Sequence, residues 1–145
     1  MGAARVAALR MLAQRRLTEA QLWARLERKG HAADQVREAV ASCKRDGYLD
    51  DRLFAELFVE QKRKAVGNVR LTGELIKRGI AREIAAAAVQ KASVSETARL
   101  ELAIAKIFRT RAAISYPSAA RTLERLGFPA SLIYSQLREL AALSP

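Results

Sequence analysis

The chain has 145 residues, half of them hydrophobic and 28% charged, and its 26 Lys and Arg against 15 Asp and Glu give a net charge of +11. This composition predicts a folded protein, either one ordinary domain or a short repeat array, and argues against a disordered chain. The single Cys excludes an internal disulfide framework, and one Cys with one His cannot supply the four ligands of a His/Cys zinc site.

Apolar residues recur at spacings of three and four between the few glycines and prolines. This spacing predicts α-helix almost throughout and no strand, so we expect an all-α protein. In chain order, the expected helices cover about residues 3–15, 18–29, 33–45, 51–66, 69–78, 82–92 and 94–113, followed by two helices whose first turns hold Pro117 and Pro129.

Short polar sequences predict where three of these helices begin. Thr18 is followed three residues later by Gln21, which is the pattern of a capping box. Ser93 and Glu96 have the same spacing and predict a second capping box. The adjacent Asp50 and Asp51 are expected to cap the fourth helix, because no third acidic ligand for a metal lies nearby in the sequence.

Three glycines mark an internal repeat. Gly30, Gly79 and Gly127 are separated by 49 and 48 positions, and each is expected to end a helix. A leucine stands four positions before each glycine and a cation two positions before, and aliphatic residues recur six and ten positions after, with Ile84 taken one position early. The period predicts three tandem three-helix repeats that form an elongated, curved array. The expected repeats are residues 1–47, 48–93 and 94–145.

The positive charge is shared over the three repeats as +5, +3 and +3, so no basic tail carries it. A cation in the last turn of a helix contributes about 0.3–1 kcal/mol through the helix dipole, which can explain Arg28, Lys77 and Arg125 without a partner. The dipole does not explain the remaining excess, because uncompensated charge destabilises a compact state. We therefore expect an acidic partner, such as nucleic acid. The residues expected to contact it are Arg25, Arg28, Lys29, Lys62, Arg63, Lys64, Arg70, Lys77, Arg78, Arg121 and Arg125.

The sequence carries no recognisable catalytic motif. A phosphate-binding Gly-rich loop, a His-Glu-x-x-His zinc motif and a Gly-x-Ser-x-Gly nucleophile motif are all missing from it. His31 follows a helix-ending glycine without a nucleophile at hand, and Cys43 is expected to be a small buried residue. Trp23 either flanks the first core or anchors a contact, and both readings stay open. We expect a protein that is not an enzyme and that holds no cofactor and no metal.

No apolar run reaches the about 18–20 residues of a membrane span, and residues 1–14 lack the apolar core of a secretory signal. We therefore expect a soluble cytoplasmic protein that does not bind membranes, and a monomer.

The central motifs are Gly47-Tyr48-Leu49-Asp50-Asp51-x-x-Phe54-Ala55 and Gly67-x-x-Arg70-Leu71-x-x-Glu74-Leu75-x-x-Arg78-Gly79-Ile80. An earlier segment reads Ala8-Leu9-x-x-Leu12-x-x-Arg15-x-x-Thr18-Glu19-x-x-Leu22-x-x-x-Leu26-x-x-Lys29-Gly30. Together these segments resemble the RecX family, and the resemblance extends over about residues 8–140.

The resemblance implies three tandem three-helix repeats, in agreement with the glycine repeat, and a bacterial regulator of the RecA recombinase. Family members dock along the helical groove of the RecA–DNA filament, where they dampen ATP hydrolysis and strand exchange, and some bind DNA. For this chain it implies a negative regulator of RecA in DNA repair, homologous recombination and the SOS response. The implied partners are the RecA filament and single- or double-stranded DNA.

The resemblance bears on only a few individual residues. Arg70, Lys77 and Arg78 fall in the central motif, and the other cations are inferred from charge alone. Asp51, Phe54 and Gly79 also match family positions, and we assign them to capping, to the core and to helix termination.

Two other functions compete with this one. A stand-alone helical DNA-binding protein is the first, since a three-helix unit can be a helix-turn-helix variant. A helical scaffold for a different protein is the second.

Overall fold

The computed structural model describes residues 2–62 and 65–143, and it leaves out the side chain of Lys62. Within these residues the chain forms nine α-helices and no strand, which confirms the predicted all-α fold. The helices are α1 (Ala3–Gln14), α2 (Glu19–Arg28), α3 (Ala33–Arg45), α4 (Asp51–Lys62), α5 (Asn68–Lys77), α6 (Arg82–Gln90), α7 (Glu96–Thr110), α8 (Tyr116–Arg125) and α9 (Ala130–Leu143).

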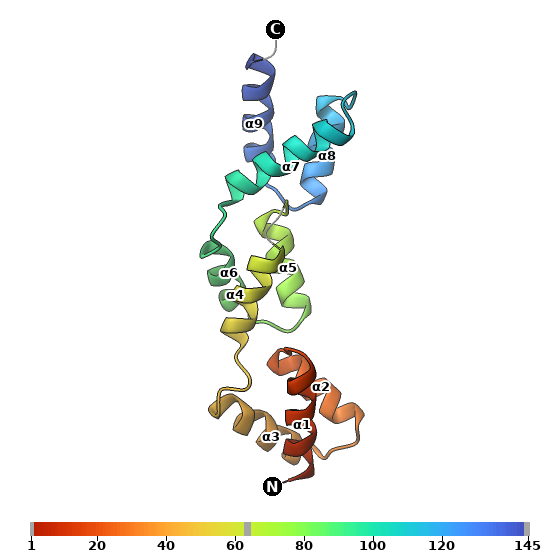
Figure 1. The fold of residues 1–145 in the computed structure, drawn as a ribbon, viewed down its shortest axis with the longest axis vertical. Helices are drawn as coiled ribbons and strands as arrows, with labels where there is room; N and C mark the ends of the chain where they lie inside the picture. Colours follow the sequence, from red (N-terminus) through yellow and green to blue (C-terminus); the bar gives the residue numbers. More distant parts are fainter. Residues whose placement is uncertain (1, 63–64, 144–145) are drawn as a thin grey trace.

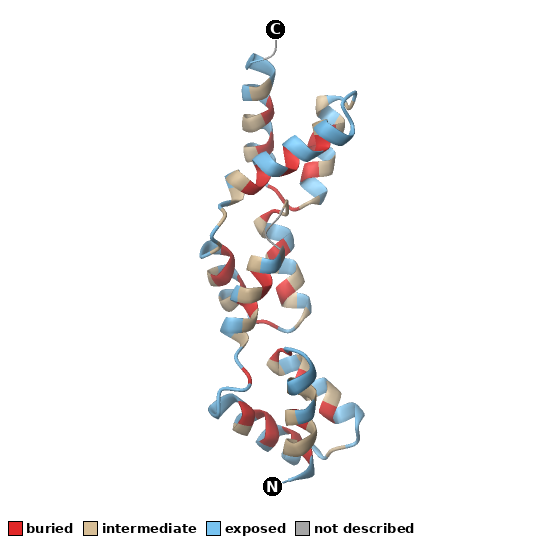
Figure 2. Cartoon of the chain, viewed as in Figure 1, coloured by how far each residue is buried: buried red, intermediate tan, exposed pale blue. Residues whose placement is uncertain are grey.

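The helices group into three units, α1–α3, α4–α6 and α7–α9, and each unit encloses its own hydrophobic core (Figure 2). The helix pairs in extensive contact all lie within a unit. The units follow one another along the long axis of the molecule, and the chain ends lie at opposite ends (Figure 1). This is the helical repeat array that the sequence predicts. The division at residues 47/48 and 93/94 stays a prediction; Leu49, just after the first boundary, packs in the first core.

Gly30, Gly79 and Gly127 end α2, α5 and α8 in the same way. Their φ angles of +91°, +90° and +94° lie in the left-handed region that favours glycine. The backbone N–H of the residue after each glycine donates to the carbonyl of the leucine four positions before it, as in a Schellman motif. These leucines are fully buried, so the predicted helix ends are confirmed.

One part of the predicted repeat alignment is wrong. The position six residues after each glycine is filled by Val36, Ala85 and Ile133, which are all fully buried. Ile84, the residue chosen from the sequence, is only partly buried. The helical register therefore selects the smaller alanine for the inner face of α6.

The second predicted capping box is also wrong. The N-cap of α7 is Ser95, whose hydroxyl accepts from the backbone N–H three residues on. Ser93 instead donates to the carboxylate of Glu60, from its backbone N–H over 3.2 Å and from its hydroxyl over 2.9 Å. Glu96 accepts from the backbone N–H of Asn68 over 2.7 Å. The side chains of Ser93 and Glu96 thus form hydrogen bonds with α4 and α5, and not with each other as the sequence pattern predicts.

The second helices of the three units, α2, α5 and α8, form a column along one side of the molecule (Figure 1). We call them the helix column, and it has two joints. At the first joint, the hydroxyl of Thr18, the N-cap of α2, donates over 2.6 Å to the carbonyl of Arg78, the C-cap of α5. At the second, the N–H of Gly67, the N-cap of α5, donates over 2.8 Å to the carbonyl of Leu126, the C-cap of α8. The three helix dipoles therefore run head to tail.

Both joints need a glycine for close approach as well as for its φ angle. A Cβ atom added at Gly79 would lie 2.3 Å from the Cβ of Ala20, and one added at Gly127 would lie 2.5 Å from the Cβ of Arg70. At Gly30, on the free end of the column, an added Cβ meets nothing within 4 Å. The joints consequently explain why two of the three repeat glycines have no room for a side chain.

Candidate functional site

The cations expected to contact a partner lie mainly on the helix column. Arg28, Lys77 and Arg125 occupy the last turns of α2, α5 and α8, and all three are exposed. Because the column helices run head to tail, this position recurs once in each unit along the same side of the array.

Some of these cations have contacts inside the chain. Arg70 forms an ion pair of 3.8 Å with Glu74, one turn along α5. Arg121 and Arg125 donate to hydroxyl groups of the preceding turn of α8, over 3.0 and 3.3 Å. Among the described residues, no ion pair or side-chain hydrogen bond is formed by Arg25, Arg28, Lys29 or Lys77.

The structure distributes the cations over separate places instead of gathering them into one pocket. Arg25, Arg28 and Lys29 lie at the free end of α2. Lys77 and Arg78 end α5, at the first joint, and Arg70 lies against Gly127 at the second. The run Lys62-Arg63-Lys64 stays a prediction, because Arg63 and Lys64 lie outside the described residues and Lys62 is described only as the last residue of α4.

Arg78 is partly buried and is held more firmly than the exposed cations. Its guanidinium lies 4.6 Å from the centre of the Phe58 ring, and Nη1 donates over 3.0 Å to the carbonyl of Glu74. Arg15 and Arg16 line a crevice together with Phe58 and Arg78, and the sequence analysis did not count them among the cations expected to contact a partner. A signal for Arg15 was present, because it stands in the family-like segment that leads into the Thr18 capping box.

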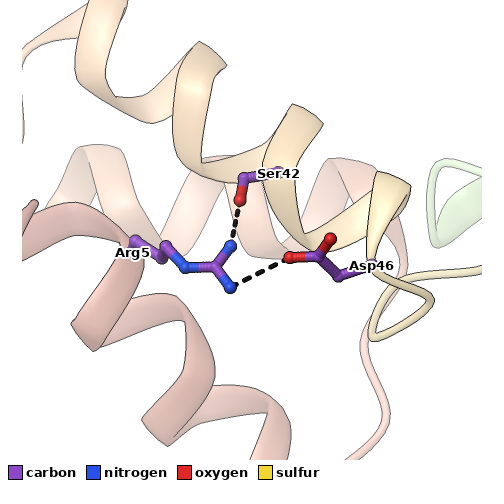
Figure 3. A network of polar contacts seen from close by, with 3 residues as sticks. All are labelled: Arg5, Ser42 and Asp46. Carbon is purple, nitrogen blue, oxygen red and sulfur yellow. Dashed lines mark hydrogen bonds and ion pairs between the residues drawn. The ribbon is translucent and has the colours of Figure 1, made fainter. Parts of the chain in front are cut away.

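Two further cations are structural. Arg5, on α1, donates to the hydroxyl of Ser42 and forms an ion pair of 3.0 Å with Asp46, so it joins α1 to the end of α3 (Figure 3). Arg99, on α7, is 1% exposed and binds backbone and side-chain oxygens of the second unit. Neither side chain can contribute its full charge to a partner, so the basic surface carries less than the net charge suggests.

Asp51 takes part in the first joint. Its carboxylate accepts from the backbone N–H of Glu19 over 2.9 Å, so the start of α4 is tied to the start of α2. Burial raises the pKa of Asp51, and this effect outweighs the opposite effect of the hydrogen bond. Of the two residues expected to cap α4, Asp50 does so by accepting from the N–H of Leu53 over 3.1 Å. The expectation for Asp51 was wrong, because Asp51 lies inside α4 and its carboxylate is taken up by α2.

Cys43 lies in the first core, and Trp23 flanks that core. Cys43 is fully buried and free, and burial raises the pKa of its thiol, which keeps it protonated at neutral pH. Trp23 packs, partly buried, against the first core.

No group of three or more His, Cys, Asp and Glu that could hold a metal ion is found in residues 2–62 and 65–143. In the same part of the chain, no helix combines the length and the apolar character needed to cross a membrane.

Models of two RecX domains match the chain. The model of the first three-helix domain matches residues 4–43, and the model of the second three-helix domain matches residues 50–89. The two matched segments coincide with the first two units of the structure.

The chain is also similar to whole RecX proteins and to a solved RecX structure. Regulatory protein RecX of Halorhodospira halophila is 33% identical over 144 residues, which cover 97% of this chain and 87% of that protein. Regulatory protein RecX of Caldanaerobacter subterraneus subsp. tengcongensis is 38% identical over 78 residues, which cover 53% of this chain and only 40% of that protein. The crystal structure of RecX from Lactobacillus salivarius has a TM-score of 0.83 at 19% identity and covers 97% of this chain and 96% of that one. It shows the same fold over nearly the whole length.

Proposed function

Because the chain belongs to the RecX family, we propose that it regulates a RecA recombinase. It binds along the groove of the RecA–DNA filament and inhibits ATP hydrolysis, strand exchange and filament growth. It acts as a monomer in the bacterial cytoplasm, in DNA repair and homologous recombination. It has no enzymatic activity of its own and needs no cofactor.

The observation that carries the proposal is the recurrence of an exposed cation in the last turn of each column helix. Arg28, Lys77 and Arg125 are spread along an elongated array instead of meeting at one point. A nucleoprotein filament presents phosphates and protein surface at regular intervals along a groove. A ligand that carries charge at regular intervals can therefore contact several protomers of the filament at once.

The joints of the helix column support an inhibitory role. The hydrogen bonds from Thr18 to Arg78 and from Gly67 to Leu126 connect the units through rigid helix ends. A chain that is stiff across its units and bridges neighbouring RecA protomers opposes the relative movements that hydrolysis and strand exchange require. The free energy of binding to the filament comes from many exposed ion pairs, each of which contributes about 0.2–1 kcal/mol.

The test is a titration of the protein into RecA filaments on single-stranded DNA, with ATP turnover as the readout. We expect turnover to fall as the protein approaches the filament in concentration. An unchanged rate at a several-fold molar excess would contradict the proposal. A helical scaffold for another protein predicts this unchanged rate, together with no retention on DNA at low salt.

Salt separates filament binding from direct DNA binding. A protein held by about 6–10 phosphates loses roughly 10³–10⁵ in affinity between about 50 and 200 mM salt. If the protein also contacts RecA itself, its affinity for the filament falls less steeply as the salt concentration rises. The steep dependence, without any effect on RecA turnover, would favour the stand-alone DNA-binding protein.

A further inference from the structure

A crevice with three arginines lies between the first and second units, beside the first joint. It has a volume of about 320 Å³, and it is formed by the segment between α1 and α2, by α4 and by the end of α5. Its lining includes Arg15, Arg16, Phe54, Phe58, Gln61 and Arg78. We call it the arginine crevice.

The guanidinium of Arg78 is fixed before any ligand binds. The ring of Phe58 lies 4.6 Å from it, and the carbonyl of Glu74 takes one of its five N–H groups. The carbonyl of Arg78 itself accepts from Thr18, so the backbone at this point is held by the joint. The other N–H groups of this guanidinium make no hydrogen bond with the described residues, and a preorganised fork loses little entropy on binding.

The charge in the crevice is not balanced within the described part of the chain. Arg15 and Arg16 are exposed and form no ion pair with residues 2–62 or 65–143. Glu19 and Glu74, on the two helices that meet at the first joint, have other partners: Glu19 pairs with Lys44 over 3.5 Å, and Glu74 pairs with Arg70. Three guanidinium groups that lie around one cavity repel one another until an anion binds between them.

We propose that the arginine crevice binds the phosphodiester backbone of a single-stranded nucleic acid. Guanidinium groups bind phosphate oxygens in pairs, and three of them around one cavity exceed what a single carboxylate can neutralise. The crevice also contains Phe54, which is partly exposed and stacks on Phe58 with 6.4 Å between ring centres and 10° between planes. A partly exposed ring beside a basic groove is the combination that holds unstacked bases, which a duplex keeps inside.

This inference rests on the proposed function in one respect, since a RecA–DNA filament contains such a strand. It adds a site that needs two units, because Arg15 and Arg16 come from the first and Arg78 from the second. The crevice therefore depends on the contact between the two units at the first joint.

The experiment measures binding of a fluorescent oligothymidylate to the full chain by anisotropy, without RecA. The variant Arg15→Ser/Arg16→Ser is compared with Arg37→Ser/Arg138→Ser, which removes the same charge from exposed positions of α3 and α9. A single strand releases about 0.7 counterions for each phosphate contact, so loss of two contacts lowers the slope of log K against log salt by about 1.4. We expect this change, with weaker binding at low salt, in the crevice variant and not in the control. Circular dichroism checks that both variants fold.

Three results would overturn the inference. The first is a wild-type chain that does not bind the oligonucleotide at about 50 mM salt. The second is an equal loss in the crevice and control variants, since net charge would then explain the binding. The third is an oligoglutamate of equal charge that binds wild type as tightly as the oligothymidylate and is lost in the crevice variant, which would assign the site to an acidic protein segment. RecA turnover is measured separately, so failure here with intact inhibition leaves the proposed function standing.

Discussion

The guanidinium of Arg99, on α7, donates a hydrogen bond of 2.5 Å to the carbonyl oxygen of Val66, in the segment that joins α4 to α5. The same group donates to the side-chain oxygen of Asn68 over 2.5 Å and to the carbonyl of Val94 over 3.0 Å. Burial lowers the pKa of Arg99, and the carboxylate of Glu96 opposes this shift. One buried cation thus satisfies three oxygens of two units and holds the second joint together.

Replacing Arg99 by Ala is expected to destabilise the protein strongly. Each buried oxygen left without a donor costs about 1–3 kcal/mol, and a Lys at this position cannot reach all three because it is a point charge. Chemical denaturation checks this, with Arg109→Ala on the exposed face of α7 as the control, expected within about 0.5 kcal/mol of wild type. Equal stability of the two variants would show that the three hydrogen bonds of Arg99 contribute little to the free energy of unfolding.

The repeat glycines are expected to differ in their tolerance of alanine. Gly30→Ala has open space and bears only the left-handed backbone cost of about 1–2 kcal/mol. Gly79→Ala and Gly127→Ala bear the same cost and also force the joint apart, which adds about 1–3 kcal/mol. Thermal unfolding of the three variants gives the ranking. If Gly30→Ala were as destabilised as the other two, close approach at the joints would not be the reason for glycine.

Asp51→Asn is expected to change how stability depends on pH. Burial disfavours the charged carboxylate, so its pKa is higher in the folded than in the unfolded chain, and the folded state holds the proton more tightly. For wild type this contribution to the free energy of unfolding is present at low pH and is lost as pH rises from about 4 through the raised pKa. An amide oxygen can still accept from Glu19 and carries no charge. The melting temperature of the variant relative to wild type should therefore be higher at pH of about 7 than at about 4.

Asp34→Asn, at an exposed carboxylate in the first turn of α3, is the control for the Asp51 variant. The control should show no such trend between the two pH values. A constant difference between Asp51→Asn and wild type would mean that burial of Asp51 does not affect stability.

The three column cations can be tested together by the variant Arg28→Ser/Lys77→Ser/Arg125→Ser. The helix dipole alone predicts a loss of about 1–3 kcal/mol in stability and no change in RecA inhibition. Contact with a filament, at about 0.2–1 kcal/mol for each exposed pair, predicts that about threefold to a hundredfold more protein is needed for the same inhibition. The matched control is Arg37→Ser/Arg82→Ser/Arg138→Ser, which removes exposed cations from the third helices. An equal effect of both variants on inhibition would show that the helix column is not part of the interface with the filament.

Solution scattering tests the elongated arrangement of the units. A compact globule of this length has a radius of gyration of about 15 Å. Units that follow one another with the chain ends at opposite ends should give a clearly larger value. A value near the compact limit would mean that the units fold back on each other in solution.

The helices and the repeat could be predicted because their signals are local. A left-handed glycine, a buried leucine one turn before it and the Thr18 capping box each depend on backbone geometry within a few residues. The same local reasoning failed at Ser93 and Glu96, where the partners are Glu60 and Asn68, about thirty residues away. A capping box has the same sequence pattern whether its side chains bond each other or a neighbouring unit.

The sequence by itself determined that the chain is helical, that it repeats, and that it carries excess positive charge along its length. Only the tertiary structure decided what each cation does: Arg99 is a buried clamp, Arg5 is paired, and Arg78 meets Arg15 and Arg16 at a crevice. The physical reason is that a charge has no preferred partner in sequence. Its role follows from burial and from the oxygens or rings within reach, and both are set when the units dock end to end through the helix column.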